Sequence, residues 1–166
     1  MLEMRVRQGE VSDLDALRAC IEAAFSPYVP RIGQRPAPLD TDFEPLLRDG
    51  RVWVAERDGR VVGTMVLVAD GETAEIRSVS VLPTCQRQGV GRSLLAHAET
   101  VARQAGHSRV RLYANAKLPE LVLYYAGLGY TEVERRQDRG FDRVFMAKTL
   151  DPLKTARSAE TERSEV

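Results

Sequence analysis

The chain has 166 residues, of which 43% are apolar and 29% are charged, and its 24 Lys and Arg are balanced by 24 Asp and Glu. This composition excludes a disordered or fibrous chain, and the length is that of one domain, which typically spans about 100 to 200 residues. Without net positive charge, nucleic acid and anionic membrane are not expected partners. No apolar run approaches the roughly 18 residues of a membrane span, and the N-terminus lacks the apolar stretch of a signal peptide. We therefore expect a cytoplasmic protein with a single domain over residues 1–150 and a polar tail over residues 151–166.

Metal chemistry is not expected from the sequence. Zinc sites require Cys and His ligands clustered at short spacings. The chain has only Cys20 and Cys85, and its two histidines, His97 and His107, stand apart from them. We therefore predict that the protein binds no metal.

The first 40 residues predict a strand, a helix and a loop. The strand covers residues 4–7, and Ser12 with Asp15 three positions later has the spacing of a capping box at a helix start. Apolar residues then recur at helical spacing as far as Phe25. Segment 26–39 contains four prolines, which predict an ordered, irregular loop instead of helix. Loops of this length are often functional.

The remainder of the chain alternates strands and helices. Asp58-Gly59 between two apolar runs is a strong hairpin signal. These runs lack strict polar alternation, so we expect strands covered on both faces, in an α/β or α+β protein. The expected order is a short helix to residue 48, strands 52–56, 61–69 and 73–81, a long helix between Gly89 and Gly106, a strand 109–114, a helix 119–128, and strands 130–136 and 141–150.

One segment carries a chemical signal. Residues 75–95 read as a strand that passes through a glycine-bearing turn into a helix. The first turn of a helix leaves backbone N–H groups unpaired and carries about half a positive charge, so it can hold a pyrophosphate. Gly89 and Gly91 allow the backbone to approach such a ligand, and Arg87 and Arg92 add positive charge beside it.

Single positions exclude two other nucleotide-binding patterns. A dinucleotide fingerprint requires a third glycine where Leu94 stands. A phosphate loop of the ATP-binding type requires Gly-Lys-Ser or Gly-Lys-Thr, and the chain has neither after these glycines. The turn therefore indicates a phosphate ligand of another kind.

This turn resembles the acetyl-CoA signature of the Gcn5-related N-acetyltransferases: Gln or Arg, two residues, Gly, one residue, then Gly or Ala. Residues 86–91 read Gln-Arg-Gln-Gly-Val-Gly, and the expected helix follows. Tyr125, Gly129 and Tyr130 are also spaced as in the family's Tyr-x-x-x-Gly-Phe/Tyr ending of a later helix. The resemblance covers residues 4–150. It implies an α/β (α+β) acyl-CoA N-acyltransferase fold, with a mixed, mostly antiparallel central sheet flanked by helices.

The resemblance also implies how acetyl-CoA, the co-substrate, is bound. In the family the pyrophosphate rests on the signature turn, and the pantetheine arm adds to the open edge of the preceding strand. Asn115, at a strand end, is predicted either to hydrogen-bond the pantetheine or to cap the following loop. The candidate cofactor-binding residues are Val79, Val81, Gln86, Arg87, Gln88, Gly89, Val90, Gly91, Arg92 and Asn115.

The implied reaction transfers acetyl from a thioester to an amine. An alkylammonium with a pKa of about 10 is almost fully protonated at pH 7, so a group must accept a proton before attack. Glu75 lies where some relatives place this general base, and the alternative is a structural carboxylate paired with Arg77 or Arg111.

A second group assists the leaving thiolate. Tyr125 matches the position at which the family places a phenol that protonates the departing sulfur. The alternatives are an aromatic residue that only packs the helix on the sheet, or a role for Tyr124 in its place. The Val79 backbone N–H is the hydrogen-bond donor that the resemblance offers to the developing oxyanion.

The proline-rich segment lines the acceptor pocket in the family. Tyr28, Arg31 and Arg35 are therefore candidate substrate residues, the alternative being an ordinary surface position, and two arginines would favour an acceptor with a carboxylate or phosphate. We expect an enzyme that acetylates the primary amine of a small molecule by direct transfer in a ternary complex. A peptide or protein acceptor and a non-catalytic acyl-CoA sensor are the alternatives. A homodimer is a further expectation, since strand-mediated dimers are common in the family.

Overall fold

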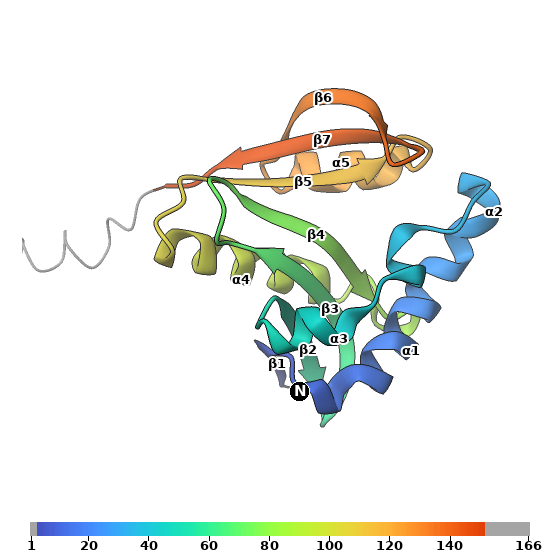
Figure 1. Ribbon diagram of the computed structural model, residues 1–166, viewed down its shortest axis with the longest axis vertical. Helices are drawn as coiled ribbons and strands as arrows, with labels where there is room; N and C mark the ends of the chain where they lie inside the picture. Colours follow the sequence, from blue (N-terminus) through green and yellow to red (C-terminus); the bar gives the residue numbers. More distant parts are fainter. Residues whose placement is uncertain (1–2, 152–166) are drawn as a thin grey trace, which may run out of the picture.

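The computed structural model describes residues 3–151 and contains a seven-stranded sheet with helices on both faces (Figure 1). The strands are β1 (Met4–Gln8), β2 (Val52–Arg57), β3 (Arg60–Val68), β4 (Ala74–Val81), β5 (Arg109–Asn115), β6 (Thr131–Asp138) and β7 (Phe141–Thr149). The α-helices are α1 (Leu14–Phe25), α2 (Val29–Ile32), α3 (Phe43–Arg48), α4 (Val90–Gln104) and α5 (Pro119–Gly127). Short 3-10 helices are η1 (Val11–Asp13), η2 (Ser26–Tyr28), η3 (Ala37–Asp40) and η4 (Pro83–Cys85).

The sheet is mixed and mostly antiparallel. Its strands follow the order β1-β2-β3-β4-β5-β7-β6, in which β4 and β5 are parallel and the other neighbours antiparallel. One apolar core lies beneath α4 and includes Leu94 and Ile76, and a second lies beneath α1 and α3 and includes Leu17 and Phe43. The predicted fold class, a mostly antiparallel sheet flanked by helices, is confirmed.

The two parallel strands stay together only at their first residues. Pairing between β4 and β5 is limited to Ala74 with Val110 and Glu75 with Arg111. Beyond these residues β4 follows β3 and β5 follows β7, and Figure 1 shows the two halves of the sheet separating. The separation opens a split in the middle of the sheet.

A β-bulge in β4 accompanies this split. Ile76 and Ser78 face consecutive residues of β3, so Arg77 is the extra residue of the bulge. As a result Ile76 and Val79 both pack against the core beneath α4, although they are three positions apart. Because a bulge bends and twists its strand, it directs the second half of β4 away from β5.

The predicted hairpin turn at Asp58-Gly59 is confirmed, and a second turn of the same kind joins the last two strands. Asp58 (φ 53°) and Gly59 (φ 73°) join β2 to β3, and Arg139 (φ 52°) and Gly140 (φ 84°) join β6 to β7. Two consecutive left-handed residues are the pattern of a type I′ turn, whose twist matches that of the flanking strands.

The start of α1 differs from the prediction. The capping box consists of Glu10, the N-cap of η1, and Asp13, its last residue, and not of Ser12 and Asp15. The Asp13 carboxylate accepts hydrogen bonds from the Glu10 N–H at 2.8 Å and from two Arg7 nitrogens at 2.8 and 2.9 Å. Arg7 on β1 therefore selects the cap through a tertiary contact that residue spacing cannot reveal.

The proline-rich segment is more helical than predicted. Residues 26–40 form η2, α2 and η3 in succession. Each of these begins with a proline in its first or second position, where the missing N–H would have no helical partner. The prolines therefore divide the segment into short helical turns, and the expectation of an irregular loop is wrong.

None of the helices within residues 3–151 is long and apolar enough to cross a membrane. The predicted tail, 151–166, lies outside the described residues except for Asp151, whose carbonyl accepts a hydrogen bond from Arg103 of α4 at 2.9 Å. The domain boundary at residue 150 stays a prediction.

The cap of α1 generates a stability prediction. Hydrogen bonds from Arg7 lower the pKa of the largely buried Asp13 carboxyl below its usual value, with the Glu10 N–H contributing. A lowered pKa stabilises the fold above the unfolded pKa of about 3.9, and this contribution is lost as the pH falls through the folded pKa. We expect Asp13→Asn to lower the free energy of unfolding by about 1 to 2 kcal/mol at pH 7. The difference from wild type should shrink below about pH 4.

Urea unfolding at several pH values measures this difference. Asp15→Asn is the matched control, because Asp15 is exposed in the first turn of α1 and should change the free energy of unfolding by less than about 0.5 kcal/mol. Equal losses in the two variants, or a loss for Asp13→Asn that is constant with pH, would contradict the role given to Asp13.

Candidate active site

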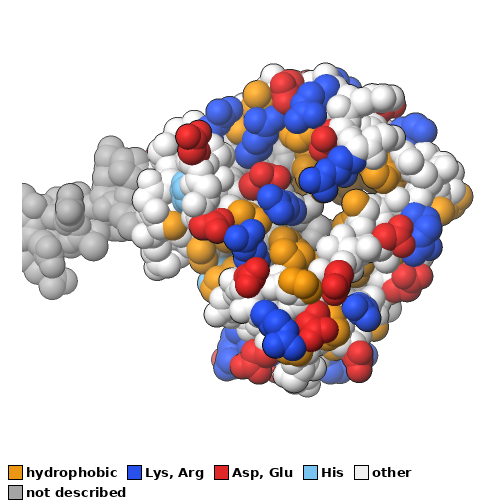
Figure 2. Space-filling model, in the orientation of Figure 1, with side chains coloured by type: hydrophobic (Ala, Val, Ile, Leu, Met, Phe, Trp, Pro, Cys, Tyr) orange, Lys and Arg blue, Asp and Glu red, His pale blue; other side chains and the backbone are white. Residues whose placement is uncertain are grey.

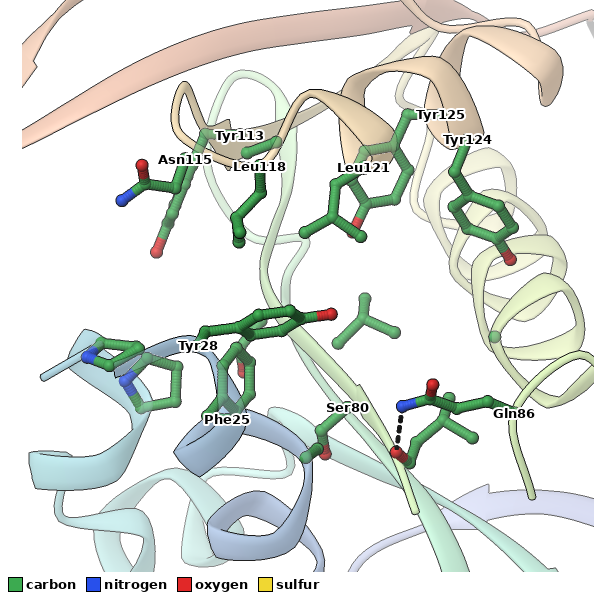
Figure 3. A pocket seen from close by; sticks show the side chains of 18 of the residues that line it. Phe25, Tyr28, Ser80, Gln86, Tyr113, Asn115, Leu118, Leu121, Tyr124 and Tyr125 are labelled. Carbon is green, nitrogen blue, oxygen red and sulfur yellow. Dashed lines mark hydrogen bonds between the residues drawn. The ribbon is translucent and has the colours of Figure 1, made fainter. Parts of the chain in front are cut away.

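A cavity of about 510 Å³ lies where β4 and β5 diverge. Its proximal half adjoins the turn between β4 and α4, and its distal half is lined by α1, the proline-rich segment and the start of β7. Figure 2 shows the hollow in this face of the molecule with basic side chains beside it, and Figure 3 shows the side chains that surround the cavity. The lining is mainly apolar and aromatic, as is typical of small-molecule sites.

The turn before α4 leaves open space at Gly89. This residue caps α4 in the left-handed conformation (φ 86°), and a Cβ there would meet no atom of residues 3–151 within 4 Å. A Cβ at Gly91, by contrast, would lie 3.1 Å from the Tyr124 hydroxyl. Bare backbone at a helix N-terminus, facing a cavity, is the arrangement that binds phosphate groups.

Two glutamine side chains hold this turn in place. Gln86 donates from Nε2 to the Val81 carbonyl at 3.2 Å, the dashed line in Figure 3. Gln88 donates to the Thr84 carbonyl at 3.3 Å and accepts a hydrogen bond from Arg57 of β2 at 2.6 Å. Gln86 lines the cavity, whereas Gln88 lies behind the lining and supports the turn.

Arg87, Val90 and Arg92 complete the proximal half, and all three line the cavity. Arg87 adopts the left-handed conformation (φ 63°), which costs a residue other than glycine about 1 to 2 kcal/mol. Val90 is buried and anchors the start of α4 in the core. The two guanidinium groups add positive charge beside the helix N-terminus, which suits an anionic ligand.

The edge of β4 that faces the split presents backbone groups. The Leu82 N–H bonds to the Val62 carbonyl of β3 at 2.9 Å. Because alternate residues of a strand point their N–H and C=O groups to opposite sides, those of Val79 and Val81 face away from β3. Both residues line the cavity, and the Val81 carbonyl already accepts from Gln86.

Two tyrosines of α5 reach the cavity from the opposite side. Tyr125 points its hydroxyl into the cavity (Figure 3), and burial raises its pKa well above the usual value. Tyr124 is more exposed, its hydroxyl lies near Gly91, and burial raises its pKa while Arg92 opposes the shift. Both are neutral phenols at pH 7 and can donate a proton or a hydrogen bond.

Glu75 lies at the base of the split, outside the cavity lining. Its carboxylate is 42% exposed and lies 3.6 Å from the Arg77 guanidinium. Arg111, its neighbour across the parallel pair, binds Glu134 at 2.7 Å. The residues that line the cavity, all within the described chain, include no Asp, Glu or His.

Of the three predicted acceptor residues, one lines the cavity and two do not. Tyr28 lines the distal half, and burial raises its pKa. Arg31 and Arg35 are outside the lining, because Arg31 pairs with Glu120 of α5 at 2.5 Å and Arg35 with Asp40 at 3.2 Å.

Side-chain contacts connect the proline-rich segment to the opposite side of the cavity. Three contacts join it to the opposite wall: Arg31 to Glu120, Lys117 Nζ to the Ile32 carbonyl at 2.8 Å, and Gln34 Nε2 to the Gly140 carbonyl at 2.9 Å. Asn115 supports the same wall, since its Oδ1 accepts the Lys117 N–H at 2.9 Å in an Asx turn while the residue also lines the cavity. These contacts bridge the distal half, called the chamber below, while the cavity as a whole stays partly open to solvent.

Sequence analysis missed the charged groups of the distal half. Arg143, 6% exposed, lines the cavity, and its guanidinium lies 4.0 Å from the centre of the Tyr113 ring and 5.2 Å from that of Phe141. Its NH1 donates to Asp138 at 2.6 Å. Arg77, the bulge residue, also lines the cavity. The only sequence signal for Arg143 is a lone arginine beside the apolar run 144–147.

The model of the acetyltransferase (GNAT) family matches residues 16–130, which run from α1 through the signature turn to the end of α5. The chain belongs to the GNAT family of acetyltransferases. It is therefore an acyltransferase that uses acetyl-CoA, and the resemblance drawn from residues 86–91 is confirmed.

Solved structures share the fold of this acetyltransferase. PaiA N-acetyltransferase from Thermoplasma acidophilum, in complex with coenzyme A, is 16% identical with a TM-score of 0.77, over 89% of this chain and 99% of that one. The ribosomal-protein-S18-alanine N-acetyltransferase from Escherichia coli is 19% identical with a TM-score of 0.68, over 90% and 95%. Naa20 from Chaetomium thermophilum, in complex with a bisubstrate analogue, is 21% identical with a TM-score of 0.65, over 88% and 86%.

The open space at Gly89 generates a binding prediction. Gly89→Val would place a branched side chain in front of the α4 N-terminus, so we expect acetyl-CoA affinity to fall at least about tenfold, or 1.4 kcal/mol. Calorimetric titration measures the affinity.

Gly106→Val is the matched control. Gly106 follows the other end of α4, is also left-handed (φ 88°), and a Cβ there would meet no atom of the described chain within 4 Å. Both variants carry the same backbone strain, but only the variant at Gly89 should lose affinity. Equal affinities in the two variants would exclude this turn as the cofactor site.

Proposed function

We propose that this acetyltransferase transfers acetyl from acetyl-CoA directly to the primary amine of a small molecule, with both substrates bound together. The observation that carries the proposal is one continuous cavity, which runs from the phosphate-binding turn through the split to the chamber behind the proline-rich segment. Acetyl-CoA supplies the activated acetyl group, and the proximal half fits its pyrophosphate at Gly89, Gly91 and the flanking arginines.

The contacts that bridge the distal half favour a small acceptor over a peptide. Two structural neighbours carry names that refer to a protein substrate or a bisubstrate analogue, but at 19% and 21% identity they share only the fold. A peptide acceptor needs an open groove beside the split, and here the contacts of Arg31, Gln34 and Lys117 bridge that position. A small molecule needs only the chamber.

The cavity favours the reactive, neutral form of the amine. Its lining is apolar apart from hydroxyl, thiol, amide and guanidinium groups, and it includes four arginines but no carboxylate. Both burial and neighbouring positive charge lower the pKa of an amine, so an ammonium that enters the cavity is deprotonated more easily than in water. The proton then needs an acceptor outside the lining.

We assign that role to Glu75, acting through water. The carboxylate is exposed at the base of the split, where β4 and β5 begin to separate, and Arg77 is its nearest charged partner in the described structure. Tyr125 is the group proposed to protonate the departing thiolate, because its neutral phenol points into the cavity opposite β4. The Val79 N–H, on the open edge of β4, is proposed to donate to the acetyl oxygen.

Thiol release from acetyl-CoA tests the proposed function. The protein is incubated with acetyl-CoA and a panel of free amino acids, aromatic amines, polyamines, aminoglycosides and short peptides, while acetyl-CoA binding is measured separately by calorimetry. Amine-dependent thiol release with at least one small amine is expected. Binding of acetyl-CoA without release for any amine would identify an acyl-CoA sensor, and release with peptides alone would establish a peptide acceptor.

The Tyr125 assignment predicts a pH-dependent defect. A thiol with a pKa of about 8.5 needs less help from a proton donor as the pH rises, because the thiolate then leaves unaided. We expect Tyr125→Phe to reduce kcat, with a deficit that narrows between about pH 7 and about pH 9.5. The pH profile of kcat at saturating acetyl-CoA measures it.

Tyr130→Phe controls for loss of a neighbouring phenol. The two rings lie 6.2 Å apart in an edge-on contact, but Tyr130 is buried outside the cavity lining. Its variant should keep the wild-type profile. A Tyr125→Phe deficit that stays constant with pH would show that Tyr125 packs or positions and does not donate.

The Glu75 assignment predicts a change in the acidic limb of the pH profile. Glu75→Gln should lower kcat/KM for the amine by about 10²-fold, while acetyl-CoA affinity changes little. The fall in rate on the acidic side should move or disappear. Glu134→Gln is the control, since Glu134 has a similar exposure, 43% against 42%, and pairs with arginines away from the cavity. An intact acidic limb and normal turnover in Glu75→Gln would reassign the proton acceptor.

A further inference from the structure

The charged residues that line the cavity are all arginines. The lining contains Arg87 and Arg92 in the proximal half and Arg77 and Arg143 farther along, with no acidic residue among them. A polyamine or aminoglycoside carries further ammonium groups that must meet carboxylates or water when the molecule is bound. This cavity provides no carboxylate for such a group, so a polycationic acceptor is disfavoured.

The Arg143 guanidinium is fixed in an orientation that suits the binding of an anion. Its guanidinium lies over Tyr113 and close to Phe141, which fixes the plane of the group, and its NH1 donates to Asp138 at 2.6 Å. A guanidinium has five N–H donors, so this single contact leaves most of them for another partner. The residue is 6% exposed, yet it lines the cavity, so those donors serve the chamber and not the bulk solvent.

The rest of the distal half is lined mainly by aromatic and proline rings. Phe25 and Tyr28 enter from the α1 side, where their rings make an edge-on contact at 6.3 Å, and Phe141 enters from β7. Pro36 and Pro38 of the proline-rich segment also line the cavity. Aromatic and proline surfaces of this kind bind an apolar or aromatic group with little loss of side-chain entropy.

We propose that the acceptor is an amino acid with an apolar or aromatic side chain, and that Arg143 binds its carboxylate. This inference rests on the proposed function, because it names the substrate class of the same site. The amine faces the split, the side chain lies among the aromatic residues, and the carboxylate bonds to the stacked guanidinium. The sequence suggested that Arg31 and Arg35 favour an anionic acceptor. In this proposal Arg143 has that role.

A carboxylate suits Arg143 better than a phosphate does. Asp138 lies 2.6 Å from the guanidinium and neutralises part of its charge. A phosphate monoester carries a charge of about −1.5 to −2 at pH 7 and would face the Asp138 carboxylate at close range. A carboxylate carries one charge and matches the planar fork of a guanidinium.

Matched amines test the proposal on the wild-type enzyme. Phenylalanine, phenylalaninamide and phenethylamine share an aromatic body and an amine, and only the first carries a carboxylate. We expect kcat/KM for phenylalanine to exceed the values for the other two by at least tenfold, and the value for spermidine to be lower still. Calorimetry with the CoA-saturated enzyme should show N-acetylphenylalanine binding at least tenfold more tightly than N-acetylphenethylamine, which tests recognition without turnover.

The variant Arg143→Gln locates the carboxylate contact. It should reduce the preference for phenylalanine over phenethylamine at least tenfold, mainly by raising KM for the amino acid, while KM for acetyl-CoA stays unchanged. Arg136→Gln is the matched control, because Arg136 also pairs with Asp138 (3.5 Å) but lies outside the cavity lining. Circular dichroism verifies that each variant is folded. If Arg143→Gln does not fold, the comparison of matched amines on the wild-type enzyme tests the proposal by itself.

The outcomes separate this inference from the proposed function. Phenethylamine or spermidine acetylated as well as phenylalanine, with equal binding of the two acetylated products, would overturn the inference and leave the acetyltransferase function intact. Acetyl-CoA binding without thiol release for any amine would overturn both.

Discussion

The separation of β4 from β5 is the constraint on which the rest of this molecule depends. Two parallel strands that paired along their whole length would bond their facing backbone groups to each other and leave no room between them. Here the pairing ends at Glu75 and Arg111, because the bulge at Arg77 turns β4 aside while β5 stays bonded to β7. Backbone groups on the open edges then need other partners. A substrate that lies along β4 can supply them, so the defect in the sheet is also the proposed binding site.

In the proposed reaction, the surroundings of the split set the protonation state of the tyrosine donor and of the amine. Burial raises the pKa of four tyrosines that line the cavity, Tyr28, Tyr113, Tyr124 and Tyr125. The same loss of solvation lowers the pKa of a bound amine. An apolar cavity thus keeps a phenol protonated, as a donor must be, and an amine neutral, as a nucleophile must be. Carboxylates would reverse the second effect, and Glu75 stands outside the lining.

Local patterns in the sequence predicted most of the fold. Apolar periodicity located α1 and α4, the Asp58-Gly59 pair located the hairpin of β2 and β3, and residues 86–91 located the turn between β4 and α4, since each of these depends on neighbours in the chain. The prediction failed where a side-chain ion pair that the spacing pattern does not reveal decides. Arg7 moves the cap of α1 to Asp13, and Glu120 and Asp40 take Arg31 and Arg35 away from the cavity.

The contrast between local patterns and contacts formed in the folded chain also explains why the sequence predicts the proximal half of the cavity better than the distal half. Most of the proximal half comes from one contiguous segment, β4 and the start of α4. A short sequence motif is therefore enough to predict its geometry. The distal half is assembled from α1, the proline-rich segment, β5 and β7, and a substitution in any one of them reshapes it without disturbing the turn. Acceptor choice can therefore change without altering the turn, because a fold does not by itself fix the function. The informative residues for the acceptor are those that burial and stacking fix in place, and in this chain Arg143 is such a residue.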